Sequence, residues 1–424
     1  MTQKPPTPWY PLDNAGKLYP AIATARWSSV FRLSAAMRAP VIARLLQQAL
    51  DRVLPRFPAM AVRLRKGFFW YYFEQNPRPL PIQKDEGHPC MPFRFKANNG
   101  FLLRVLYDDR RISVEFFHSL ADGAGAMVFL KTLVGEYLRL CGVPMTYGQG
   151  VLDPRKKPAP GEAEDAFLRM PLPRVHAPRR ETRAYHLPGA AEPPHTLHLI
   201  AASMPYAALS ERARALSVTV TEYLTAALIY AAYKQQQQTR GKLLPVRASV
   251  PVNMRRFFAT QTLRNCSTYV TPGIDPRLGA FTFEEIAEQV HAYMRYAVYP
   301  KRLYAGIATN VASERNLFLR LCPLPIKNLA IHSVFRFVGD RTTTTTLSNL
   351  GRIDAPAPMM PHVERFEAVL GPAATPGCHA VLTTTRDTLL LTFTRNQRDA
   401  LLPRETLRFL VAQGVPVLVE SNQG

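Results

Sequence analysis

A histidine that lies between a strand-like run and a helix-like run places the strongest constraint on this chain. Residues 112–116 alternate apolar and polar side chains, which predicts a strand with one buried face. Residues 124–140 are largely apolar and predict a helix. Between the two runs, His118 is followed by Asp122 and Gly123. Because strand ends hold side chains rigidly over clefts, we expect chemistry at His118.

A proline-rich segment divides the chain. Its prolines are Pro154, Pro158, Pro160, Pro171, Pro173, Pro178, Pro188, Pro193 and Pro194. Proline at this density disfavours helix interiors and central strands. We therefore predict an N-terminal lobe over residues 1–150, a crossover linker over 151–194 and a C-terminal lobe over 195–424.

Both predicted lobes combine helix and strand signals. An apolar stripe at helical spacing predicts a helix over residues 41–54, and alternating large apolar residues predict a strand over 68–73. Thr219 and Glu222 have the spacing of a capping box at the start of another helix. Residues 329–337 show a mixed pattern. An α+β fold with two lobes of similar size fits these signals.

The net charge of +22 is unusual for a chain of 424 residues. The excess is mostly arginine and is spread along the sequence. It favours polyanions as partners, an anionic membrane surface, or a phosphorylated cofactor drawn in by electrostatic focusing. Arginine-rich codon usage is a further interpretation of part of the excess. These interpretations stay open at the level of the sequence.

Targeting signals and metal sites are not indicated. No apolar run approaches the roughly 20 residues that span a bilayer, and residues 1–6 lack the apolar core of a signal peptide. We expect a cytoplasmic, monomeric protein. The five cysteines have no short pair spacing, so neither a zinc site nor a disulfide framework is expected. They are Cys90, Cys141, Cys266, Cys322 and Cys378.

The pattern His-x-x-x-Asp-Gly that begins at His118 resembles the signature of the CoA-dependent acyltransferase superfamily. This superfamily includes chloramphenicol acetyltransferase, the condensation domains of peptide synthetases and the alcohol acetyltransferases. Three further stretches, residues 250–256, 269–273 and 347–351, resemble the bacterial alcohol acetyltransferase branch and follow its order. No Asp-Phe-Gly-Trp-Gly motif is present, which argues against the plant-type branch.

The resemblance implies a fold and a catalytic base. The fold consists of two chloramphenicol-acetyltransferase-like lobes with mixed sheets flanked by helices, and the active-site tunnel lies at the lobe interface. Many condensation domains carry two adjacent histidines, but Phe117 occupies the first of those positions here. His118 is therefore the residue that matches the general base of the family. A neutral imidazole can accept the proton of an attacking hydroxyl.

Structural roles at the site are expected for Asp122, Gly123 and Arg255. In proteins with this pattern the aspartate pairs with an arginine of the other lobe, and Arg255 matches that arginine by position. An unpaired buried charge is costly, so such a pair would hold the loop of His118 in place. Helix N-capping is a compatible alternative for Asp122. Gly123 would let the backbone pass close to its neighbours.

Ser348 and Asn349 are further candidate catalytic residues. The β-branched run over residues 342–347 predicts a strand that ends at Ser348-Asn349-Leu350-Gly351. A hydroxyl or amide at that strand end could donate a hydrogen bond to the oxyanion of a tetrahedral intermediate. Serine, asparagine and glycine are also common turn residues, so a plain turn is the alternative.

Together these features favour an acyltransferase that moves an acyl group, with acetyl the first expectation, from acyl-CoA to the hydroxyl of a small-molecule alcohol. Acyl-CoA would be the co-substrate, and no metal is expected. Three alternatives stay open. The thioester could come from an acyl carrier protein, the acceptor could be an amine, or the protein could be a non-catalytic homologue that binds polyanions. For the enzyme, nucleic acid is not an expected partner.

Overall fold

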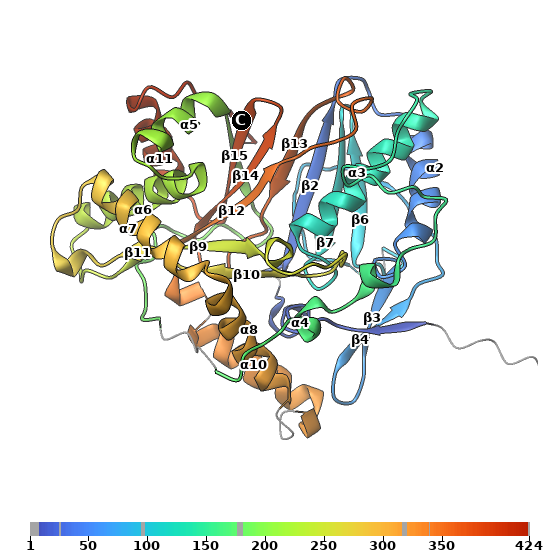
Figure 1. The fold of residues 1–424 in the computed structure, drawn as a ribbon, viewed down its shortest axis with the longest axis horizontal. Helices are drawn as coiled ribbons and strands as arrows, with labels where there is room; N and C mark the ends of the chain where they lie inside the picture. The colour runs from blue at the N-terminus through green and yellow to red at the C-terminus, as the bar shows by residue number, and fades with distance from the viewer. Residues whose placement is uncertain are drawn as a thin grey trace, which may run out of the picture.

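Two sheets with helices on their outer sides lie next to each other in the computed structural model (Figure 1). The structure describes residues 8–24, 27–94, 98–175, 181–315, 320–338 and 340–422. The α-helices are α1 (Tyr19–Ile22), α2 (Ala43–Val53), α3 (Gly123–Leu140), α4 (Ala166–Arg169), α5 (Tyr206–Ala215), α6 (Val220–Gln238), α7 (Phe283–Ala297), α8 (Pro300–Arg315), α10 (Leu324–Val338) and α11 (Leu401–Ala412). The 3-10 helices are η1 (Leu54–Arg56), η2 (Pro160–Ala163), η3 (Met254–Arg256), η4 (Pro276–Leu278) and η5 (Asp340–Thr342).

The first sheet has five strands in the order β13-β2-β7-β6-β5. Their bounds are β2 (Val30–Met37), β5 (Gln83–Lys84), β6 (Leu103–Asp108), β7 (Arg111–Phe117) and β13 (Val363–Val369). Three of the four strand pairs are antiparallel, whereas β5 runs parallel to β6. Strand β13 comes from late in the chain and pairs with β2, so distant segments complete this sheet. Helices α2 and α3 pack together beside it.

The second sheet has eight strands, in the order β10-β9-β12-β14-β15-β8-β16, with β11 paired to β9. Their bounds are β8 (His198–Pro205), β9 (Val246–Asn253), β10 (Ser267–Val270), β11 (Gly273–Ile274), β12 (Thr345–Arg352), β14 (Cys378–Thr385), β15 (Thr388–Arg395) and β16 (Leu418–Ser421). Helix α6 is largely buried, and α5, α7 and α11 pack on it.

A small third sheet corrects one prediction. Its order is β1-β4-β3, with bounds β1 (Trp9–Pro11), β3 (Val62–Lys66) and β4 (Tyr71–Gln75). The strand predicted over residues 68–73 is therefore wrong at its start. The backbone N–H of Gly67 donates to the carbonyl of Trp70 (2.9 Å), which closes a turn. The large apolar residues of this turn imitate strand alternation, yet Phe68 is 71% exposed.

Other local predictions are confirmed. Helix α2 covers most of residues 41–54 and buries Leu46, Ala49, Leu50 and Val53, as the apolar stripe indicated. The capping box forms at the start of α6, where Thr219 Oγ1 accepts from the Glu222 N–H (3.2 Å) and Glu222 Oε2 accepts from the Thr219 N–H (2.7 Å).

The proline-rich segment contains only short helices in its described part, η2 and α4. Within it, Glu162 contacts residues from both sides of the molecule. Its carboxylate accepts two hydrogen bonds from Arg56 (2.5 and 2.7 Å), and its carbonyl accepts from the Leu263 N–H (2.9 Å). Pro178 and residues 1–7 lie outside the described residues.

No single helix in the described ranges has the length and apolar character needed to cross a membrane. The bent pair formed by α5 and α6 meets the test by length and composition only, and the two helices are bent by 80° at their junction.

Candidate active site

A cavity of about 1220 Å³ lies between the two large sheets and is lined by residues from both. Phe31, His118 and Met127 contribute from the N-terminal part of the chain. Val252 and Ser348 contribute from strands of the second sheet. Residues from both large sheets therefore face one shared cavity.

The cavity opens where two neighbouring strands of the second sheet separate. Strands β9 and β12 pair in parallel only at Ala248–Thr345 and Ser249–Thr346. Beyond that point β9 pairs with β10, while β12 continues along β14. Pro251 follows the last shared pair, at a position where a residue without an N–H costs the β9–β12 ladder no hydrogen bond. The separated ends of both strands line the cavity.

His118 follows the last residue of β7 and is held through its backbone. Its N–H donates to the carbonyl of Ser29 (2.8 Å), and its carbonyl accepts from Asn265 Nδ2 (3.0 Å). The imidazole stacks on Tyr19, with ring centroids 4.5 Å apart and an interplanar angle of 17°. Phe31 packs against the ring at 4.9 Å. These contacts leave the side chain little freedom to rotate.

The environment of His118 favours the neutral imidazole. Burial removes water from the ring and lowers its pKa below the ordinary value of 6.5. The Nδ1 atom is buried and forms no hydrogen bond to the described residues. At pH 7 the side chain is therefore an uncharged base at the edge of a large cavity.

Asp122 takes both of the roles that the sequence left open. As the N-cap of α3, its Oδ1 accepts from the Gly125 N–H (3.0 Å). Its Oδ2 accepts from Arg255 Nη1 (2.7 Å), from the Cys266 N–H (2.9 Å) and from Ser267 Oγ (2.8 Å). These donors satisfy the carboxylate and lower its pKa, outweighing the opposing effect of burial. The carboxylate thus joins the helix to the second lobe.

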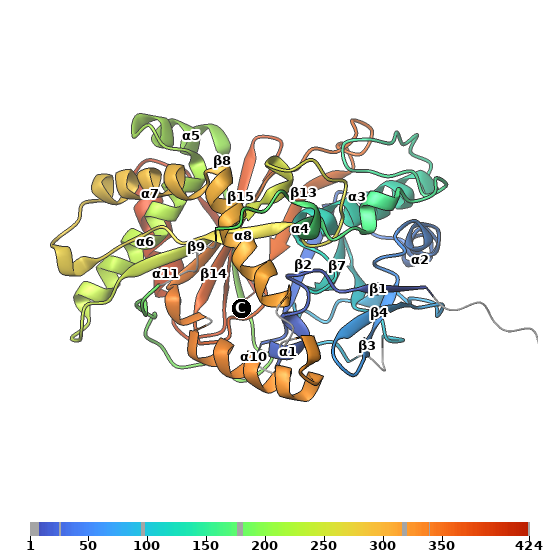
Figure 2. The ribbon, with the colours of Figure 1, turned by 60° about the horizontal axis from the view of Figure 1, so that its bottom comes forward.

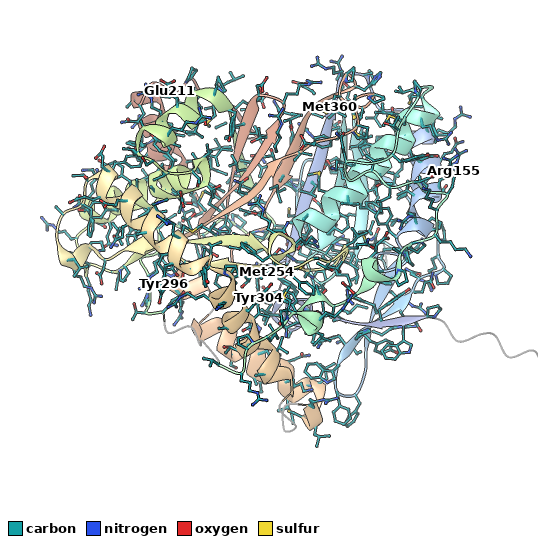
Figure 3. The ribbon with its side chains drawn as sticks, in the orientation of Figure 1. Arg155, Glu211, Met254, Tyr296, Tyr304 and Met360 are labelled. Carbon is teal, nitrogen blue, oxygen red and sulfur yellow. The ribbon has the colours of Figure 1, made fainter. Side chains whose placement is uncertain are left out.

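Arg255 lies in η3, directly after β9. Besides the ion pair with Asp122, it donates from Nε to the carbonyl of Thr262 (3.0 Å) and from Nη2 to that of Arg264 (2.6 Å). The neighbouring Met254 is fully buried. Figure 3 labels it near Tyr304 of α8, whose hydroxyl donates to the Phe257 carbonyl (2.7 Å). Packing on α8 therefore supports the turn that presents Arg255.

Close contacts surround two glycines in the first turn of α3, with a side chain at Gly123 and with backbone at Gly125. A Cβ atom added at Gly123 would lie 2.7 Å from Leu350 Cδ2, and one added at Gly125 would lie 1.9 Å from the carbonyl oxygen of Leu263. Both contacts come from the second lobe. The absence of side chains at these two positions lets the first turn of α3 approach β12 and the loop before β10.

Ser348 and Asn349 occupy different surroundings from those expected. The predicted strand over residues 342–347 begins later and continues through both residues, because β12 spans Thr345–Arg352. The Asn349 side chain donates to Thr221 Oγ1 (2.7 Å) and accepts from the Gly351 N–H (2.6 Å). Ser348 lines the same cavity as His118 and makes no side-chain hydrogen bond to a described residue. Between these two residues, the serine hydroxyl is therefore the donor with no side-chain hydrogen bond to a described residue.

Sequence reasoning missed four residues of the site. Tyr19 stacks on His118, Asn265 binds its carbonyl, and Ser267 binds Asp122. Lys131 of α3 lines the cavity and donates to the carbonyl of Asp354 (2.8 Å). Only Tyr19 had a sequence signal, because it lies in an aromatic, turn-rich segment near the N-terminus.

Within the described ranges, no group of three or more histidine, cysteine, aspartate or glutamate side chains is arranged to hold a metal ion.

Comparison with known proteins places the fold. No family model and no curated protein matches the chain. Solved structures do match. Polyketide synthase associated protein 5 from Mycobacterium tuberculosis aligns with a TM-score of 0.62 and 14% identity, over 95% of this chain and 96% of that one. The trichothecene 15-O-acetyltransferase of Fusarium sporotrichioides aligns with a TM-score of 0.58 and 11% identity, over 95% and 93% of the two chains.

Condensation domains match equally well. The first condensation domain of the calcium-dependent antibiotic synthetase aligns with a TM-score of 0.61 and 15% identity, over 97% of this chain and 99% of that one. The TM-scores, over nearly the whole length of both chains, establish a shared fold at these low identities. The chain thus has the α+β fold of condensation domains and CoA-dependent acyltransferases, as the His-x-x-x-Asp-Gly resemblance implied.

Proposed function

We propose that this protein is an acyltransferase that moves an acyl group from acyl-CoA to the hydroxyl of an alcohol, with His118 as the general base. The observation that carries the proposal is the uncharged, immobilised imidazole at a cavity between the two lobes. The volume of about 1220 Å³ exceeds the range of roughly 300–1000 Å³ for ordinary ligand pockets. Such a cavity has room for a donor and an acceptor together.

The proposed reaction is a direct transfer. The imidazole of His118 accepts the hydroxyl proton while the hydroxyl oxygen attacks the thioester carbonyl carbon. The tetrahedral intermediate carries an oxyanion, and Ser348 Oγ donates a hydrogen bond to it. The C–S bond then breaks, and the imidazolium returns the proton to the leaving thiolate. No covalent bond to the protein forms.

Asp122 and Arg255 would support this reaction without taking part in it. The imidazole of His118 and the carboxylate of Asp122 form no hydrogen bond with each other, and the Oδ2 contacts of that carboxylate go to the second lobe. The Asp122–Arg255 ion pair therefore holds the loop that carries His118 against the other side of the cavity. Its role is to position the base.

Two similar folds bear on the substrates. The starter condensation domain of rhizomide synthetase, which aligns with a TM-score of 0.59, was solved with C8-CoA. The Fusarium relative is named as an O-acetyltransferase. These names support acyl-CoA as donor and a hydroxyl as acceptor, and make acetyl-CoA the first donor to test.

The proposal is tested by release of free thiol across a series of acyl-CoA donors with pooled alcohols. His118→Ala should lower turnover by about 10²–10⁴-fold. Because the pKa of His118 lies below 6.5, wild-type activity should persist at pH 6.5 and fall only at lower pH. The matched control is His198→Ala, since His198 pairs with Glu192 (2.9 Å) and does not line the cavity. Near-normal turnover by a folded His118→Ala protein would exclude His118 as the base.

Ser348 is tested in the same assay. Ser348→Ala should lower kcat by about 10²–10³-fold with little change in donor binding, because the lost hydrogen bond forms only to the oxyanion. If the substitution changes thermal stability and leaves kcat intact, the serine is only a strand residue.

A further inference from the structure

Large apolar side chains gather on the surface where the β3–β4 turn meets α10. In the ribbon views this turn and the helix lie at one end of the molecule (Figures 1 and 2). We call these residues the end patch. They are Phe68 (71% exposed), Phe69 (37%), Leu321 (60%), Ile326 (58%) and Leu329 (70%). Exposed apolar clusters of this kind mark interaction surfaces.

Hydrogen bonds make the turn and the helix a single surface. The Leu324 N–H donates to the carbonyl of Phe68 (2.9 Å), and Lys327 Nζ donates to the carbonyl of Phe69 (2.9 Å). One helical turn after Leu324, Asn328 Nδ2 donates to the hydroxyl of Tyr71 (2.8 Å). The exposed phenylalanines are therefore fixed beside the exposed face of α10.

Helix α10 is amphipathic in the opposite sense from an ordinary surface helix. Its Lys327 is only 5% exposed and lies 3.4 Å from the ring centroid of Trp70. Burial lowers the pKa of this lysine. The adjacent face presents Ile326, Leu329 and Ala330 to solvent. A helix in water normally buries its apolar face and exposes its lysines, so the surface of α10 is suited to an apolar medium.

Basic residues surround the end patch. Lys66 immediately precedes the turn and is exposed, whereas neighbouring Arg65 pairs with Glu74 (2.7 Å). The ammonium of Lys17 lies 5.3 Å from the centroid of the Trp70 ring, and exposed Arg320 precedes Leu321. The apolar surface is therefore bordered by positive charge, on a chain with a net charge of +22.

We propose that the end patch docks on the surface of an anionic phospholipid bilayer. The aromatic and aliphatic side chains would enter the boundary between headgroups and acyl chains, while the basic border would contact the phosphates. An anionic bilayer matches both the exposed apolar side chains and the basic border of the end patch. A nucleic acid would match the charge and leave Ile326 and Leu329 in water. The inference is independent of the acyl transfer proposed above.

The test is co-sedimentation of the full chain with vesicles. One set contains phosphatidylcholine alone, and the other contains phosphatidylcholine with phosphatidylglycerol. Wild type should sediment with the anionic vesicles and be released by high salt, because salt screens the attraction between exposed charges. Phe68→Ser and Leu329→Ser should each lower the partition coefficient about tenfold or more, from the lost burial of one large apolar side chain. Lys66→Glu should lower it roughly tenfold.

The matched control is Leu278→Ser. Leu278 is 77% exposed in η4, which follows β11, and β11 lies far from α10 in Figure 1. This variant should sediment like wild type. All four variants change exposed side chains, so unfolding is not expected to confuse the result. Thiol release from a soluble acyl-CoA should be unchanged in all of them, which separates a failure here from a failure of the proposed reaction.

Three results would overturn the proposal. Wild type could stay in the supernatant with anionic vesicles, or Phe68→Ser and Leu329→Ser could bind as tightly as Leu278→Ser. Light scattering could also show a wild-type dimer that the Phe68→Ser Leu329→Ser double variant converts to a monomer. A second copy of the chain, and no membrane, would then cover the end patch.

Discussion

Two buried carboxylates flank the loop that carries His118, and their pKa values move in opposite directions. Asp122 lies on the side of α3, and its pKa is lowered. Asp13 lies in the N-terminal segment, and its pKa is raised to about 6. Both are nearly inaccessible to water, and each lies beside an arginine, Arg255 at 2.7 Å and Arg264 at 3.4 Å.

Burial raises the pKa of both carboxylates, and the groups that stabilise the charged form explain the difference between them. Asp122 Oδ2 alone accepts three bonds of 2.7–2.9 Å, one of them from the guanidinium of Arg255. Asp13 accepts one short bond from the Gly16 N–H (2.6 Å), but its contacts with Asn265 are 3.3 Å long. Nearby Asp165 adds negative charge. An adjacent arginine thus does not determine the charge state of a buried carboxylate; the number and length of its hydrogen bonds also matter.

The largest effect is expected from breaking the Asp122–Arg255 pair. Asp122→Asn or Arg255→Gln alone should destabilise the protein by about 3–5 kcal/mol, because each leaves an uncompensated buried charge. Activity should fall in both variants as His118 loses its position. The double variant should lose much less stability than the sum of the single losses, measured by denaturant unfolding in a double-mutant cycle. Additivity within about 0.5 kcal/mol would contradict the coupling.

Ionisation of Asp13 should change the free energy of unfolding with pH in the opposite direction from ionisation of Asp122. Its pKa is about 6 in the folded protein and 3.8 by ordinary value, so between these values the folded state binds more protons than the unfolded state. Stability contributed by Asp13 is therefore present below pH 4 and is lost as pH rises through 6, by about 3 kcal/mol.

Asp13→Asn should remove this decrease, because the amide keeps an acceptor for the Gly16 N–H and does not ionise. The measurement is the free energy of unfolding from pH 4 to pH 7, compared between wild type and variant. Asp122→Asn is the control, since its lowered pKa affects stability only at more acidic pH. If the free energy of unfolding changes equally with pH in wild type and Asp13→Asn, Asp13 is already ionised at low pH and its pKa is not raised.

The smallest change in stability is expected from removing a single hydrogen bond to Asp122. Ser267→Ala removes the 2.8 Å donor and should cost about 1.5 kcal/mol, because the acceptor is charged. It should also shift acid unfolding to higher pH as the pKa of Asp122 moves toward its ordinary value. Ser28→Ala is the matched control, since Ser28 Oγ donates to the neutral carbonyl of Cys90 (2.7 Å). An identical acid shift in both variants would rule out a specific effect on Asp122.

The local signals in the sequence predicted local structure well. Alternation over residues 112–116 and the apolar run after Asp122 correspond to β7 and α3, because strand and helix periods reflect backbone geometry within a few residues. The His-x-x-x-Asp-Gly pattern also led to the correct fold. The strand predicted over residues 68–73 was wrong at its start, and the cause was also a local sequence pattern. Phe68 and its neighbours imitate a strand, yet they form a turn that presents them to the surface.

The sequence by itself thus determined the strand, the base candidate, the helix cap and the fold class. Tertiary structure alone decided the properties that depend on distant groups. The donors of Asp122 include Arg255, which is 133 residues away, and Asn265 binds both Asp13 and the His118 carbonyl from a distant part of the chain. Lys327 is buried only because Trp70 and the Phe69 carbonyl reach it from a separate hairpin. Charge state and exposure follow from desolvation and from partners far along the chain, which no local pattern encodes.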